Sequence, residues 1–180
     1  MHRIEIEDQR AGLPWPYLAI LLGEIAVLGH WVAASAGRPP RIYEMGWLGC
    51  GSMLVMQVYS IRRRVRALSE LGPLRAWLDL HVFLGLQGFV LVAYHSVGVS
   101  PRASLAAINF ALVAIVVATG VIGRYLYGLI PRARRTRQGS LALDIAERAF
   151  ARWIVLHRPL AVLLLAITTL HVLAHFAYAV

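Results

Sequence analysis

Four histidines in two apolar segments have the residue type and spacing to carry chemistry. His81 and His95 are fourteen residues apart in one segment, and His157 and His171 are fourteen apart in the other. On a helix this spacing spans about 21 Å and nearly four turns, so both rings of a pair point from nearly the same face. Histidine within a membrane span is costly unless it has a partner. We therefore interpret the four residues as axial ligands of two haems; the alternative is packing histidines bonded to nearby carbonyls.

Two glycines lie close to this histidine face of the first segment. Gly85 follows His81 by about one turn, and Gly88 lies midway between His81 and His95. A helix face with no side chain at these positions can lie against flat, bulky groups. We expect both glycines to contact the cofactors.

The composition predicts an all-α membrane protein. Of its 180 residues 59% are hydrophobic, and the mean hydropathy is +0.64, which is too apolar for an ordinary soluble domain. Apolar runs of about twenty residues have the length that crosses a bilayer. We predict one helical-bundle domain over residues 1–180 with about five spans, near residues 16–36, 43–61, 77–97, 105–129 and 155–180.

The charges predict the orientation of this bundle. All eighteen basic residues are arginines, which cluster between apolar segments; this pattern indicates cytoplasmic loops and lipid headgroups rather than nucleic acid. The positive-inside rule places the N-terminal segment 1–13 and the loop 131–153 in the cytoplasm and the C-terminus outside, as in an inner membrane. The acidic residues of segment 1–13 are not typical of a cleaved signal. The second half of the loop has helical spacing and is expected to lie at the interface.

This topology brings the histidines into two level pairs. The third and fifth spans run parallel, so His81 and His157 share the cytoplasmic half, while His95 and His171 share the outer half. Cys50 is the single cysteine, so there is no CxxCH motif and the haems must be of the non-covalent b type. His175 lies one turn beyond His171 and is an alternative ligand to it.

Other polar residues near the spans are open to two interpretations. Arg75, Arg124 and Arg158 flank the inner pair and are suited to bidentate pairing with haem propionates, although ordinary positive-inside arginines would occupy the same places. Glu24 and His30 in the first span are candidates for a proton path or for simple hydrogen bonding between helices. Their roles and that of His175 are left open.

Two spans that each carry HX13H, separated by one other span, resemble the di-haem core of cytochrome b of bc complexes. They resemble equally the transmembrane domain of ferric reductases and NADPH oxidases. The likeness covers roughly residues 75–180 and is carried by the four histidines and Gly88. It implies that His81 pairs with His157 and His95 with His171, each pair ligating one b haem. The flavin and nicotinamide domain of the reductases, and the PEWY-like quinone motif of the bc subunit, are both missing from this sequence.

These observations lead us to expect an electron-transfer subunit. It would carry electrons across the membrane between a quinone or quinol pool and a partner such as cytochrome c, an iron–sulfur protein or a flavin protein, within a larger respiratory or photosynthetic complex. One alternative is a stand-alone oxidoreductase acting on oxygen, superoxide or ferric iron. Another is a histidine-lined metal transporter or a structural membrane subunit. The sequence does not indicate the donor, the acceptor, the direction of electron flow or the haem potentials.

Overall fold

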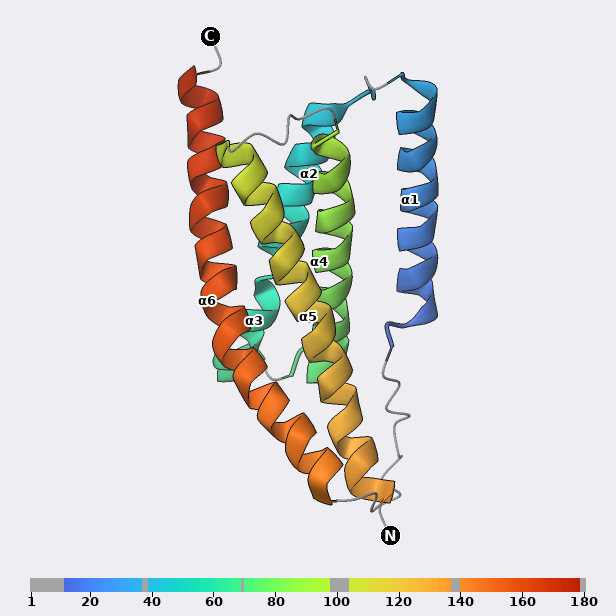
Figure 1. The fold of residues 1–180 in the computed structure, drawn as a ribbon, viewed down its shortest axis with the longest axis vertical. Helices are drawn as coiled ribbons and strands as arrows, with labels where there is room; N and C mark the ends of the chain where they lie inside the picture. The colour runs from blue at the N-terminus through green and yellow to red at the C-terminus, as the bar shows by residue number, and fades with distance from the viewer. Residues whose placement is uncertain (1–11, 37–38, 69, 98–103, 137–139, 179–180) are drawn as a thin grey trace.

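The computed structural model describes residues 12–36, 39–68, 70–97, 104–136 and 140–178, which form helices joined by short connections (Figure 1). No strand occurs within these ranges. Most of the predicted cytoplasmic segment 1–13 and most of the connection between the predicted spans 77–97 and 105–129 lie outside the described residues, as do the side chains of residues 127–143. The fold is therefore all-helical wherever it is described, as the composition predicts.

Six α-helices and one short 3₁₀-helix make up the described chain. In order they are α1 (Trp15–Ala34), α2 (Ile42–Val55), α3 (Val58–Arg64), η1 (Arg66–Leu68), α4 (Leu74–His95), α5 (Leu105–Thr136) and α6 (Ser140–Tyr178). Among the described residues, four helices are long and apolar enough to cross a membrane: α1, α4, α5 and α6. These four correspond to the first, third, fourth and fifth predicted spans.

The second predicted span is not one continuous helix. It consists of the 14-residue α2 and the 7-residue α3. Between them the hydrogen bonds span three residues instead of four. The N–H of Gln57 donates to the carbonyl of Leu54, and the N–H of Ser60 donates to the carbonyl of Gln57. These are i to i−3 bonds of the 3₁₀ kind, which often mark a hinge or a functional break. The prediction of an unbroken span over residues 43–61 is wrong at this joint.

The junction of the last two spans also differs from the prediction. α5 continues to Thr136, and α6 runs for 39 residues from Ser140 to Tyr178. The helix expected in the second half of the loop 131–153 is present, but it continues directly into the last span instead of ending before it. This extension persists through Pro159, which lies inside α6.

α4 and α6 lie on opposite sides of α5, with α2 behind them (Figure 1). α5 packs against both α4 and α6, while α2 packs against α4 and α1 packs against α4. Two aromatic contacts join α2 to α6, one between Tyr43 and His175 and one between Trp47 and Phe176. The two histidine-bearing helices are therefore bridged on one side by α5 and on the other by α2.

The buried core is small and consists of two clusters, one between α1 and α4, formed by Leu28, Leu91 and Tyr94, and one at the α5–α6 contact. Leu112, Val113 and Val116 of α5 pack with Leu164 of α6. Many large apolar side chains lie on the outside instead; Val155 of α6, for example, is 70% exposed. An apolar outer surface of this kind is what contact with lipid requires, because a bilayer solvates such side chains and water does not.

The arginine-rich connections gather toward one end of the bundle. Figure 1 shows the start of α1, the α3–α4 connection and the α5–α6 junction toward the lower end, whereas α6 finishes at the upper end. At the α3–α4 connection Gly72 adopts φ +83°, a conformation that favours glycine, and its carbonyl accepts a hydrogen bond from Arg62. α4 and α6 therefore run in the same direction through the bundle, as expected for the third and fifth spans (Figure 1).

Candidate cofactor site

His81, near the start of α4, is oriented by the break between α2 and α3. Its Nδ1 lies 3.0 Å from the carbonyl oxygen of Met56. A carbonyl only accepts, so Nδ1 carries the proton and donates, which leaves the lone pair on Nε2. The N–H of Ser60 donates to Gln57 instead of Met56, and the Met56 carbonyl accepts from the N–H of Tyr59 as well as from His81. The ring of Tyr59 lies beside the imidazole, with centroids 5.2 Å apart.

His95, the last residue of α4, is held in the same way at the opposite end of α2. Its Nδ1 lies 2.8 Å from the carbonyl oxygen of Ile42, the first residue of α2. The ring packs directly on Gly46, where an added Cβ would lie 2.7 Å from Nδ1. α2 therefore braces both histidines of α4, because it offers one carbonyl at its start and another just past its end.

His157 on α6 is oriented by α5. Its Nδ1 lies 2.9 Å from the Oγ1 of Thr119, and that hydroxyl is itself 2.8 Å from the carbonyl oxygen of Val116. The hydroxyl proton is committed to Val116, so Oγ1 must accept from Nδ1, and Nε2 again keeps its lone pair.

A tryptophan of α6 supports this arrangement. Trp153 stacks on the ring of His157 with centroids 5.2 Å apart and donates its Nε1–H to the carbonyl of Thr119. Gly123 of α5 gives the indole its room, since a Cβ at that position would overlap the Trp153 ring. Gly120 lies next to the imidazole itself, with an added Cβ 3.4 Å from the Cε1 of His157. The two α5 glycines thus fix where Trp153 and His157 lie.

The outer end of α6 offers two histidines instead of one. His171 is half-buried and lies within electrostatic range of both His95 and His175. His175 is exposed, and the ring of Tyr43 lies between it and His95, with centroid distances of 5.8 Å and 6.3 Å respectively. No hydrogen bond holds the ring of His171 within the described residues. Both of these histidines thus lie near His95 or its neighbour Tyr43 and are candidates for its outer partner.

The structure brings the four predicted ligands together in two groups. His81 and His157 lie within electrostatic range of each other near the arginine-rich end, and His95 and His171 do so near the end of α6. Bis-histidine ligation of a haem needs two oriented imidazoles with a lone pair on the facing nitrogen. Three of the four rings meet this requirement through an Nδ1 hydrogen bond of the kind that usually orients a metal-bound histidine. The inner group, with both rings oriented, therefore fits such a cofactor, whereas in the outer group only His95 is oriented in this way.

The three predicted arginines differ in their surroundings. Arg124 of α5 is buried and pairs with Asp79 of α4, with Nη2 and Oδ1 2.6 Å apart. Arg75 lies 4.0 Å from the other oxygen of the same carboxylate. Arg158 is exposed on α6. Their pairing with haem propionates stays a prediction.

The sequence reasoning missed Asp79. A signal was present, since an acidic residue two positions before His81 within an apolar run needs a partner. The Nε of Arg124 is buried without a hydrogen-bond partner among the described residues, so part of that guanidinium remains able to bind a further acceptor.

The two predicted glycines of α4 face α2. An added Cβ at Gly88 would lie 3.2 Å from the carbonyl oxygen of Gly49 and would overlap the side chain of Met53. At Gly85 it would lie 3.4 Å from the Sδ of Met56. Both positions therefore permit the close approach of α2, and two flexible methionine side chains cover them. Their contact with a cofactor remains a prediction.

Within the described residues, no group of three or more histidine, cysteine, aspartate or glutamate side chains is arranged to hold a metal ion. Comparison with protein-family models, with curated proteins and with solved structures finds no match to this chain.

Proposed function

We propose that this protein is a di-haem b-type membrane cytochrome that carries electrons across the bilayer. The observation that carries the proposal is the shared hydrogen-bonding pattern of His81, His95 and His157. Each donates its Nδ1–H to an acceptor on a neighbouring helix and keeps the lone pair of Nε2. An Nδ1–H bond to a neighbouring acceptor is the usual orientation of a metal-bound histidine, and it leaves Nε2 of each ring able to bind iron.

The inner site would be built by His81 from α4 and His157 from α6. Met56 and Thr119 hold the two rings in place and, by accepting from Nδ1, make each Nε2 a better donor to a metal. Trp153 packs on one ring and Tyr59 lies beside the other, so the surroundings are largely apolar. A haem bound between two such imidazoles supplies a one-electron iron couple whose potential depends on ligation, burial and hydrogen bonding.

The outer site would be built by His95 with His171, or with His175 in its place. Because His81 and His95 lie about 21 Å apart along α4, the two sites belong to opposite halves of the membrane. Electrons would pass between a quinone or quinol pool and a partner such as cytochrome c, an iron–sulfur protein or a flavin protein. We place the chain as one subunit of a larger respiratory or photosynthetic complex.

Replacing the histidines one at a time tests the pairing. Redox titration of the purified wild-type protein is expected to resolve two b-haem components. His81→Ala and His157→Ala should each remove the same component, and His95→Ala should remove the other. His171→Ala or His175→Ala should match His95→Ala, which also identifies the outer ligand.

His30→Ala provides the control, because His30 is exposed on α1 and lies on neither predicted ligand helix. It should leave both components unchanged. Loss of different components in His81→Ala and His157→Ala would contradict the proposed pairing, and retention of both components in all five ligand variants would contradict haem ligation by these residues.

A further inference from the structure

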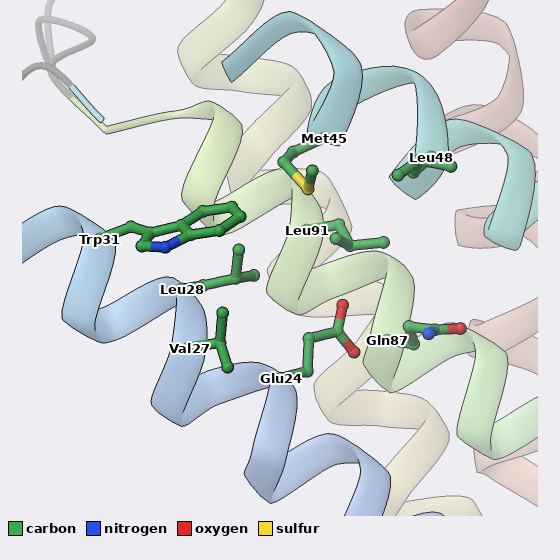
Figure 2. A pocket seen from close by; sticks show the side chains of 8 residues that line it. All are labelled: Glu24, Val27, Leu28, Trp31, Met45, Leu48, Gln87 and Leu91. Atoms are coloured by element: carbon green, nitrogen blue, oxygen red, sulfur yellow. The ribbon is translucent and has the colours of Figure 1, made fainter. Parts of the chain in front are cut away.

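A cavity of about 310 Å³ lies between α1, α2 and α4, apart from the four histidines (Figure 2). Leu28 and Trp31 of α1, Met45 of α2 and Leu91 of α4 form most of its wall. This volume is at the lower end of the range of about 300–1,000 Å³ that is usual for small-molecule sites. The cavity is mostly apolar, so a few polar groups decide what it binds.

Those polar groups are the carboxyl of Glu24 and the amide of Gln87. Figure 2 shows them facing each other from α1 and α4 at one end of the cavity. The hydroxyl of Ser52 donates to the Leu84 carbonyl at 2.9 Å, and its Oγ lies 3.5 Å from the Oε1 of Gln87. The Oε2 of Glu24 is buried and has no hydrogen-bond partner within the described part of the chain. A buried carboxyl oxygen without a partner is costly, and a ligand that supplies one would be favoured.

The cavity opens toward lipid rather than water. Val27 and Leu48 form part of its lining and are 51% and 56% exposed on the outer surface of the bundle. Glu24 is the tenth residue of the 20-residue α1, so it lies about 15 Å from either end of that helix. A ligand reaching this depth must therefore be soluble in the membrane.

The lining also restricts the shape of the ligand. An indole and a methionine thioether both make favourable contacts with an aromatic ring. An acyl chain would fill the apolar part but would leave the Oε2 of Glu24 without a partner. A compact ring that carries hydroxyl or carbonyl oxygens satisfies both requirements.

We propose that this cavity binds the ring of a membrane-dissolved quinone or quinol. Ionised Glu24 can accept from a quinol hydroxyl, and protonated Glu24 or the amide of Gln87 can donate to a quinone carbonyl. Exchange of electrons with this ligand rests on the proposed function, whereas binding itself does not. α2 contacts both the cavity and the outer histidine. Met45 of this helix lines the cavity, and the next residue, Gly46, packs against the ring of His95.

Equilibrium binding of decylubiquinone and its quinol to the full chain in lipid nanodiscs tests the proposal. Val27→Trp places an indole at the mouth of the cavity and is expected to weaken binding at least tenfold. Ile25→Trp adds the same side chain on the same helix at a residue that is 50% exposed and does not line the cavity, and it should change affinity less than twofold. Glu24→Leu should weaken quinol binding about tenfold through the lost hydrogen bond.

Haem content is measured in the same samples so that the two proposals can fail separately. Saturable binding that responds to Val27→Trp and not to Ile25→Trp supports the site, whether or not haem is present. Absence of saturable binding to the wild-type chain, or equal loss in both tryptophan variants, overturns it even if both haems are found.

Discussion

The acceptors of the three Nδ1 hydrogen bonds determine what the histidines can do. Met56 and Ile42 offer carbonyl oxygens, and Thr119 offers a hydroxyl whose proton is committed elsewhere. Each acceptor selects the tautomer with its lone pair on Nε2, the nitrogen that faces away from the bond. The orientation of the candidate ligands thus depends on residues that would not themselves touch a metal.

Thr119→Val tests this dependence at the inner site. The valine has nearly the same shape but cannot accept from His157, so the buried Nδ1–H loses its partner and the preferred tautomer is no longer enforced. Loss of such an orienting partner typically lowers metal affinity about 10–100-fold. We expect haem loss from the inner site alone, measured as haem retained per chain after competition with apomyoglobin.

The control is Thr169→Val. Thr169 is exposed on α6, and its hydroxyl donates only to the Leu165 carbonyl one turn earlier. Equal haem retention in the two valine variants would show that Thr119 does not orient a ligand.

Asp79 and Arg124 form the buried ion pair that holds α4 to α5. Their side chains are 9% and 7% exposed, so removing one partner leaves a buried charge without compensation. Asp79→Asn is expected to lower the free energy of unfolding by about 3–5 kcal/mol. The double variant with Asp79→Leu and Arg124→Met should recover most of this loss. An unchanged unfolding midpoint in Asp79→Asn would contradict the structural role of the pair.

The histidines could be predicted from sequence because spacing along a helix is a local property. Their acceptors could not, since the Met56 carbonyl lies 25 residues from His81 in the sequence and the Ile42 carbonyl 53 residues from His95, so only the tertiary fold brings them together. The interruption between α2 and α3 contains neither glycine nor proline; it has no local sequence signal, so tertiary contacts must impose it. Asp79 could have been found, because an acid in an apolar span requires a partner.

At the scale of helices, α2 acts as a brace for α4. Its two ends supply the carbonyls that hold His81 and His95, and in its middle Gly49 lies against Gly88 of α4. Glycines at such crossings let helix backbones approach closely, which is the usual way that helices associate in membranes. Packing therefore explains Gly46 and Gly49 of this segment.

Gly46→Ala tests the brace at its outer end. The added methyl group would lie 2.7–2.9 Å from three atoms of the His95 ring, so either the ring or α2 must move. Overpacking of this kind costs about 1–3 kcal/mol, and we expect selective loss of the outer haem component in a redox titration.

Gly51→Ala is the matched control on the same helix, since an added Cβ there meets nothing within 4 Å. It should leave both components intact. If Gly46→Ala also leaves both intact, the outer site does not depend on the position of His95 in this structure.

The starts of the helices can be predicted from the sequence where a long apolar run begins. α1, α4 and α5 begin within three residues of the predicted starts near 16, 77 and 105. The α5–α6 junction was predicted less well, because arginine-rich sequence indicates a loop, yet alanine, leucine and arginine are also strong helix formers. The helix therefore continues past the end of the apolar stretch.

At the scale of the whole molecule, the arginines predict which end of the bundle faces the cytoplasm. Glu70 lies in the exposed α3–α4 connection and Ser104 is exposed just before α5. In a Cys50→Ser background, Ser104→Cys should react with a membrane-impermeant maleimide on intact cells, and Glu70→Cys should react only after permeabilisation. The reverse pattern would place the inner and outer histidine pairs on the opposite sides of the membrane.

We propose that four histidines on α4 and α6 bind two haems. The most direct measurement is a reduced-minus-oxidised spectrum of the purified wild-type chain, with haem quantified as its pyridine complex against protein concentration. The proposal predicts a low-spin b-type spectrum and two haems per chain, neither of them covalently attached. A protein that is folded and helical but contains no haem after expression with adequate haem supply would contradict it.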